Sequence, residues 1–144
     1  MLVHQVLAGK ALAGVVSLPR STKVADAARV LSEKKIGTVL ISDDGTTADG
    51  ILSERDIVRE LARVGSGCLE QSVDGFMTRT VVTCAPDANA QTVMAQMTEG
   101  RFRHMPVVED GKVIGVISLG DVVKAELQRI AMEKDALEGM IMGH

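Results

Sequence analysis

Two short segments of the chain place a serine three residues before an aspartate. They are residues 50–56 (GILSERD) and 115–121 (GVISLGD), and in each an apolar stretch leads into the Ser-x-x-Asp pair. At the start of a helix such a pair forms a capping box, in which the hydroxyl and the carboxylate each accept a backbone N–H. The same groups suit a ribose phosphate, because an ionised aspartate accepts hydroxyl hydrogens and helix N-terminal N–H groups attract phosphate.

These two uses compete for the carboxylates of Asp56 and Asp121. A single Ser-x-x-Asp motif is best explained as a helix cap. Its recurrence 65 residues later, at Ser118 and Asp121, favours a ligand site. Ligand binding then requires the carboxylate to turn outward instead of closing the capping box.

Both motifs belong to an internal repeat with an offset of about 66 residues. Apolar residues at helical spacing precede each motif. They are Val24, Ala27, Ala28 and Leu31 in the first half and Ala90, Val93, Met94 and Met97 in the second.

Each half therefore reads as strand, helix, strand, hairpin, strand and helix, an α/β architecture of the α+β sandwich type. The expected strands are 15–18, 38–41 and 50–53 in the first half and 81–84, 104–108 and 113–118 in the second. Asp-Gly turns at 43–45 and 109–111 predict the hairpins. A short helical lead-in precedes each half, with Val3, Val6 and Leu7 in the first and Val73, Phe76 and Met77 in the second.

One half is too small to bury an adequate core, so we expect two β-α-β-β-α repeats packed through their sheets around a shared core. The expected domains are 8–66 and 72–130, joined near Gly65–Gly67, with a helical extension over 131–144. The apolar residues of the last helix follow 4-3 spacing, which predicts either burial against the chain itself or a dimer contact. They are Val123, Leu127, Ile130, Leu137 and Ile141, with Lys134 interrupting them.

The composition excludes several classes of function. A net charge of −3 argues against a nucleic-acid surface, and a chain with no Trp or Tyr has few stacking platforms for bases. No apolar run predicts a membrane span, and the N-terminus lacks the pattern of a signal peptide. Cys68 and Cys84 have no metal spacing, which fits a reducing cytoplasm. No catalytic motif is present, so we expect a protein that is not an enzyme.

The ordered pair of motifs resembles a tandem pair of cystathionine-β-synthase (CBS) domains. The segment 103–111 (RHMPVVEDG) and the repeated helix pattern add to the likeness, which extends over roughly residues 8 to 130. More narrowly, the chain is similar to stand-alone bacterial proteins with two CBS domains. The resemblance implies a pseudo-twofold module with two clefts, a disc-shaped homodimer, and a sensor that signals to a downstream protein. Its ligands would be AMP, ADP, ATP or NAD(H), with S-adenosylmethionine ranked behind them.

The resemblance also implies which residues line the clefts, with the aspartate on the ribose and the serine near the phosphates. The first cleft would combine Ser53, Glu54, Arg55 and Asp56 with Thr83, Ala85, Arg103, His104, Met105 and Pro106. The second would combine Ser118 and Asp121 with Ser17, Leu18, Gly37, Thr38 and Val39.

The two clefts differ in charge. Arg55, Arg103 and His104 give the first cleft cationic donors that suit phosphate. In the second cleft, Leu119 and Gly120 stand in place of Glu54 and Arg55, and Gly37-Thr38 in place of Arg103-His104. We therefore expect a phosphorylated adenosine in the first cleft and an empty or weakly occupied second cleft. The alternative function is a structural scaffold for dimerisation or docking that binds no nucleotide.

Overall fold

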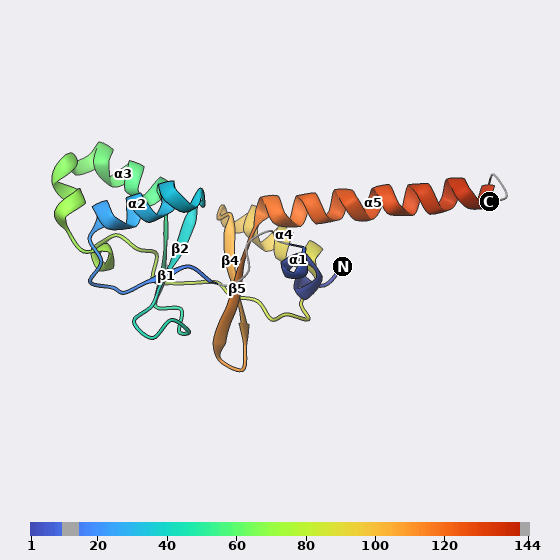
Figure 1. Ribbon diagram of the computed structural model, residues 1–144, viewed down its shortest axis with the longest axis horizontal. Helices are drawn as coiled ribbons and strands as arrows, with labels where there is room; N and C mark the ends of the chain where they lie inside the picture. Colours follow the sequence, from blue (N-terminus) through green and yellow to red (C-terminus); the bar gives the residue numbers. More distant parts are fainter. Residues whose placement is uncertain (10–14, 142–144) are drawn as a thin grey trace.

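A computed structural model describes residues 1–9 and 15–141, which form two helix-and-strand halves and a projecting helix. The helices are α1 (Val3–Ala8), α2 (Val24–Lys34), α3 (Glu54–Val64), α4 (Ala90–Gly100) and α5 (Leu119–Ile141), with 3-10 turns η1 (Ser66–Glu70) and η2 (Val73–Gly75). The strands are β1 (Ser17–Leu18), β2 (Thr38–Ile41), β3 (Gly50–Ser53), β4 (His104–Glu109) and β5 (Lys112–Ser118). In Figure 1, α2 and α3 lie at one end of the molecule, α1 and α4 lie towards the other, and α5 extends beyond the body.

The strands form two small sheets, one in each half. In the first, β1 is parallel to β2 and β2 is antiparallel to β3. In the second, β4 and β5 form an antiparallel hairpin. Asp110 and Gly111 turn this hairpin with φ values of 53° and 77°, as a two-residue type I′ turn requires. The predicted turn of the second half is therefore confirmed.

The predicted hairpin of the first half is also present, because β2 and β3 are antiparallel neighbours, but a longer loop over residues 42–49 joins these strands. Asp44 organises this loop by accepting hydrogen bonds from Ser42 Oγ, from the N–H groups of Thr46 and Thr47, and from Thr47 Oγ1. These bonds, led by the Thr47 hydroxyl, hold the pKa of Asp44 below its ordinary range. The loop also reaches the other half, because Thr46 O accepts the N–H of Val113 at 2.8 Å.

The expected strand at 81–84 is absent from the described structure. Only Cys84 pairs there, by a single bridge to Val107. The equivalent strand β1 is held by the Leu40 N–H to Val16 O and by the Ser42 N–H to Leu18 O. In the second half the Val108 N–H bonds to Cys84 O, but the position equivalent to Leu40 is Pro106, which has no N–H to donate. Pro106 therefore reduces the strand to one bridge.

The apolar residues form two clusters, one in each half, where the sequence predicted one shared core. The first-half cluster contains Val24, Ala27, Leu31, Val39, Ile41, Leu52, Ile57, Val73 and Met77. The second-half cluster contains Val3, Val6, Ala90, Val93, Met97, Met105, Val107, Ile117 and Val122. The apolar helix positions predicted from their spacing are thus buried or packed against these clusters.

Each cluster is completed by the lead-in segment of the other half. Val3 and Val6 of α1 belong to the second-half cluster, and Val73 and Met77 belong to the first-half cluster. The backbone repeats this exchange: Leu2 bridges to Asn89 before α4, and Ser72 bridges to Lys23 before α2. Neither half can therefore complete its core without a segment of the other.

Two equivalent glycines allow these exchanged segments to lie close to the strands. A Cβ on Gly50 would lie 2.5 Å from Met77 Sδ and 3.0 Å from Thr78 O, and a Cβ on Gly115 would lie 2.8 Å from Leu7 Cδ2. The glycine in each strand thus leaves room for the segment of the other half that packs against it.

Gly50→Ala is expected to lower the free energy of unfolding by about 1–3 kcal/mol, because the methyl group would overpack this contact. Gly67→Ala is the control, since no atom lies within 4 Å of its Cβ position. Thermal unfolding followed by circular dichroism measures both variants. Equal stability of the two variants would contradict the close contact between halves.

Candidate functional site

Both Ser-x-x-Asp motifs form closed capping boxes. Ser53 Oγ accepts the N–H of Asp56 at 3.2 Å, and Asp56 Oδ2 accepts the N–H of Ser53 at 2.9 Å. Ser118 Oγ and Asp121 Oδ2 make the same two bonds, at 3.0 and 2.8 Å. The structure therefore realises the capping alternative at both motifs. A carboxylate offers about four lone-pair sites, so capping does not by itself use up the aspartate.

In each half, a backbone hydrogen bond connects the first residue of the helix that follows the motif to the residue just before a strand. The N–H of Glu54 donates to Gly37 O at 3.0 Å, and the N–H of Leu119 donates to Arg103 O at 2.8 Å. These equivalent bonds bring the two helix starts and the segments around residues 37 and 103 to the centre of the molecule.

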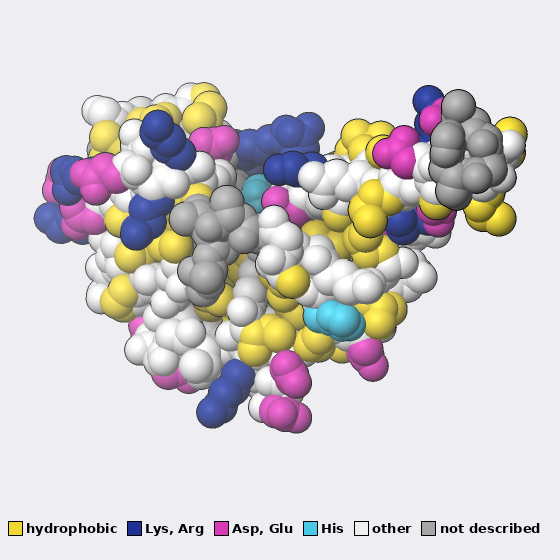
Figure 2. Space-filling model, turned by 45° about the vertical axis from the view of Figure 1, so that its right-hand side comes forward, with side chains coloured by type: hydrophobic (Ala, Val, Ile, Leu, Met, Phe, Trp, Pro, Cys, Tyr) yellow, Lys and Arg dark blue, Asp and Glu magenta, His cyan; other side chains and the backbone are white. Residues whose placement is uncertain are grey.

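The first cleft is a cavity of about 540 Å³ between the two halves. From the first half, Ser53, Glu54, Arg55 and Asp56 line it, and from the second half Arg103 and His104 do. The structure thus brings together six of the ten residues that the sequence assigned to this cleft. Figure 2 shows Lys and Arg side chains gathered around a hollow at the joint between the halves, with a histidine inside it.

The other four predicted residues lie elsewhere. Thr83 and Ala85 are not among the described residues that line the cavity, and Met105 and Pro106 are buried within β4. The preceding part of the same connection lines the cavity in their place. The added lining residues from this connection are Thr78, Thr80, Val81 and Val82.

Sequence reasoning missed two arginines of the first cleft. Arg59 lies one helical turn after Arg55 on α3, and Arg101 ends α4; both line the cavity. The spacing of four residues from Arg55 to Arg59 is a signal that could have identified the first. Four arginines, against Glu54 and Asp56, make this cleft the more cationic of the two.

The second cleft is a cavity of about 1010 Å³ between α5, α1 and the start of β2. Ser118, Asp121, Gly37 and Thr38 line it as predicted. Val39 is buried in the first-half cluster and Leu18 packs against it, and Ser17 is not among the described residues that line the cavity. Three cations that sequence reasoning missed also line it: Lys35, Lys124 and Arg129.

Arg129 is already engaged by carboxylates of its own helix. It donates to Glu126 at 3.0 Å and to Glu133 at 2.7 Å, and the bonds to Glu126 raise the pKa of Arg129. These carboxylates would therefore compete with a phosphate for Arg129.

A basic residue with left-handed backbone ends the helix before each cleft. Lys35 ends α2 with φ 55°, and Arg101 ends α4 with φ 57°. This conformation is uncommon for residues with a side chain and usually costs free energy. Lys35 lines the second cleft and Arg101 the first, so equivalent positions supply each cleft with one cation.

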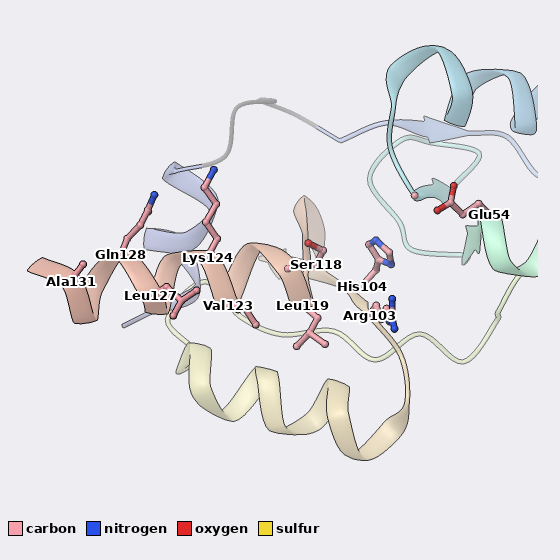
Figure 3. A pocket seen from close by; sticks show the side chains of 12 residues that line it. Glu54, Arg103, His104, Ser118, Leu119, Val123, Lys124, Leu127, Gln128 and Ala131 are labelled. Atoms are coloured by element: carbon pink, nitrogen blue, oxygen red, sulfur yellow. The ribbon is translucent and has the colours of Figure 1, made fainter.

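A third cavity, of about 830 Å³, lies along α5 between the two clefts. Figure 3 shows Arg103 and His104 between α5 and Glu54, with Leu119, Val123 and Leu127 along the helix. Gly37 and His104 line all three cavities, so they mark the centre where the clefts meet. Thr38 Oγ1, which lies between the two clefts, is buried and has no hydrogen-bond partner among the described residues.

The apolar residues of α5 that follow 4-3 spacing are exposed. Leu127 is 62% exposed, Leu137 58% and Ile141 84%. The alternative in which the chain buries this surface against itself is therefore wrong for these positions, and the dimer contact remains as a proposal.

The part of the chain that the structure describes contains neither a membrane-spanning helix nor a metal-binding cluster. Within residues 1–9 and 15–141, no helix is long and apolar enough to cross a membrane. The same residues contain no cluster of His, Cys, Asp and Glu that could hold a metal ion.

Comparison with known proteins shows the same repeat. The profile of the CBS domain matches twice, over residues 12–63 and 73–128. Among solved structures, a CBS-domain-containing protein from Agrobacterium tumefaciens is 40% identical, with a TM-score of 0.83 over 88% of this chain and 99% of that one. A CBS domain protein from Pyrobaculum aerophilum, complexed with AMP, is 23% identical with a TM-score of 0.76, over 92% and 99% of the two chains.

Among curated relatives, the mitochondrial CBS-domain protein CBSX3 of Arabidopsis thaliana is 31% identical over 124 residues. That alignment covers 83% of this chain but 60% of CBSX3, and a second Arabidopsis thaliana relative, CBSCBSPB3, is matched over 23% of its length. The chain thus spans less than two thirds of these two curated relatives.

Ser53→Ala and Ser118→Ala are each expected to lower the free energy of unfolding by about 1 kcal/mol, since each removes a formed helix cap. Ser32→Ala is the control, because Ser32 is exposed within α2 and alanine favours a helix. Thermal or urea unfolding followed by circular dichroism gives the three values. No loss in either capping variant would mean that the capping boxes are open in solution.

Proposed function

The chain belongs to the CBS-domain family, and we propose that it is a regulatory module that binds an adenosine-containing ligand between its two repeats. The observation that carries this proposal is the first cleft, where Asp56 of one half meets Arg101, Arg103 and His104 of the other. A ligand that contacts both sides would fix the relative position of the halves. The module itself has no catalytic role in this proposal.

The charges of the first cleft favour AMP, ADP or ATP as the ligand. Arginine binds phosphate in a two-pronged manner, and four arginines line this cavity. NAD(H) would bind through its adenosine end, and S-adenosylmethionine ranks behind these because its sulfonium is cationic. The complexes of relatives support an adenosine ligand in general: one CBS domain pair holds 5-methylthioadenosine and S-adenosyl-L-methionine, and the Pyrobaculum protein holds AMP.

Each part of such a ligand has a partner in the first cleft. Asp56 would accept the ribose hydroxyls, while Ser53 and the N–H groups at the start of α3 would lie near the phosphate with Arg55 and Arg103. The base would pack against apolar side chains of the cavity, which are Ile51, Val81, Val82 and Phe102. Thr38 Oγ1 supports a ligand in this region, because a buried hydroxyl normally has a hydrogen-bond partner.

The second cleft would bind more weakly or accept the less charged part of a dinucleotide. It shares the Ser-x-x-Asp cap, but Leu119 and Gly120 replace the charged residues that follow Ser53. Its Arg129 is held by Glu126 and Glu133. The two clefts of one chain would therefore differ in affinity.

The protein would act as a homodimer that passes the ligand signal to a downstream partner. Val58 of α3 and Val123 of α5 occupy equivalent positions in the repeat and are 64% and 41% exposed. The apolar residues of α5 continue this surface beyond the body of the molecule, as Figure 1 shows for the helix itself. Because α5 begins at the second cleft, a change in the angle between the halves would move its far end.

We assign residues 8–66 and 72–130 to the two domains and 131–144 to the extension, of which 142–144 lie outside the described residues. Cys68 and Cys84 are both free thiols, which suits the reducing cytoplasm. The second candidate function is a scaffold that dimerises or docks without a nucleotide. The exposed apolar surface of α5 fits that function equally well, so ligand binding must decide between the two.

AMP at a hundred times its dissociation constant is expected to stabilise the protein by about 2.7 kcal/mol. For a chain of this size that is a rise of about 5–10 °C in melting temperature. Because Trp and Tyr are absent, the melt is followed by circular dichroism or calorimetry. No shift with AMP, ATP, NADH or S-adenosylmethionine would leave the scaffold as the function.

The matched controls for this test are Asp56→Ala and Asp121→Ala, which remove equivalent carboxylates from the two clefts. Asp56→Ala is expected to weaken AMP binding by about 1.5–3 kcal/mol, the contribution of a hydrogen bond to a charged group. Asp121→Ala should weaken it less. Titration calorimetry measures both, and a larger effect of Asp121→Ala would reverse our ranking of the clefts.

Ile130→Glu combined with Leu137→Glu is expected to convert the dimer into a monomer of 15.3 kDa, because it places charges in the apolar surface of α5. Met132→Glu is the control, since Met132 is 72% exposed but lies outside the 4-3 pattern. Sedimentation equilibrium measures the mass of each protein. A wild-type chain that sediments as a monomer would rule out the proposed homodimer.

A further inference from the structure

The carboxylate of Asp56 is held from two sides in the first cleft. Its Oδ2 accepts the N–H of Ser53 at 2.9 Å, and its Oδ1 accepts a guanidinium N–H of Arg59 at 2.7 Å. Asp56 is only 6% exposed. Arg59 therefore occupies Oδ1, the oxygen that the capping box leaves open for the hydroxyls of an incoming ribose.

Arg59 differs from Asp56 in its freedom to move. Its side chain is 62% exposed, whereas that of Asp56 is 9% exposed. Ion pairs with an exposed partner are weak, and an exposed arginine side chain can adopt other rotamers at small cost. Arg59 can thus leave Asp56, while the capping box keeps Asp56 in place.

We propose that Arg59 occupies the ribose position on Asp56 in the free protein and moves to the phosphate when a phosphorylated adenosine binds. This inference rests on the proposed function of the first cleft. Arg59 lines the same cavity as Arg55, Arg101 and Arg103, so the phosphate that these cations attract is within the same space. The guanidinium then exchanges one anionic acceptor for another.

The exchange makes the phosphate a requirement for tight binding. Adenosine must displace Arg59 from Asp56 and offers the guanidinium no acceptor in return. AMP must also break the bond between Arg59 and Asp56, but its phosphate then accepts a charge-assisted, two-pronged contact from the Arg59 guanidinium. Arg59 is therefore a specificity-determining residue that selects phosphorylated ligands over the free nucleoside.

The second cleft has a different residue at this position. Lys124 is the equivalent of Arg59 and lines the second cleft together with Asp121. An ammonium group is a single point of charge and cannot form the two-pronged contact of a guanidinium. The preference for phosphorylated ligands over the free nucleoside is thus specific to the first cleft.

The test is titration calorimetry of adenosine and AMP against wild type, Arg59→Gln and Arg63→Gln. Arg63 is the matched control, because it pairs with Glu60 in the same i,i+3 geometry at 2.9 Å and is not among the described residues that line the first cleft. Arg59→Gln is expected to bind adenosine about two- to fivefold more tightly, the range of an exposed ion pair. It should bind AMP more than about tenfold more weakly, since one bond to a charged group is lost.

Arg63→Gln should leave both affinities at the wild-type values. If wild type binds AMP but Arg59→Gln and Arg63→Gln have the same ratio of adenosine affinity to AMP affinity, the inference about Arg59 is overturned and the proposed function is not. Failure of wild type to bind either compound would overturn the proposed function and the inference together. Circular dichroism of each variant verifies that the fold is unchanged.

Discussion

The exchange of lead-in segments between the two halves is the constraint on which the other features depend. α1 completes the second-half cluster, and the segment around Val73 and Met77 completes the first-half cluster. Each exchanged segment lies against a strand at a glycine, Gly50 or Gly115, where any larger side chain would collide. Because each core needs the other half, the halves are held at close range, and the clefts form where their helix starts and strand starts meet.

This arrangement explains how a helix cap can also be part of a binding site. The capping box fixes the serine and the aspartate at the helix start without any ligand. A group that is already positioned loses little conformational entropy on binding. The capping alternative and the ligand alternative are therefore compatible, and in our proposal the ribose would compete with Arg59 for the carboxylate.

The two halves are equivalent in backbone and different in charge. Equivalent hydrogen bonds connect Glu54 to Gly37 and Leu119 to Arg103, and equivalent left-handed residues end α2 and α4. The side chains on this common frame diverge, with four arginines in the first cleft and an internally paired Arg129 in the second. Divergence of side chains on a duplicated backbone would allow the first cleft to specialise in phosphorylated ligands while the second binds more weakly.

The sequence by itself determined the repeat and the helices, because these follow from spacing and from residue type. The placement of Ser53 and Asp56 in one cleft with Arg103 and His104 came instead from the resemblance to a pair of CBS domains. It could not determine the exchanged lead-ins or the two separate cores, since apolar spacing shows which face is buried but not which half covers it. Likewise the strand expected at 81–84 has a suitable sequence, but Pro106, far along the chain, has no N–H to donate to it. Only the tertiary structure placed Arg59 on Asp56, because that contact depends on how a side chain turns at the joint and not on its position in the sequence.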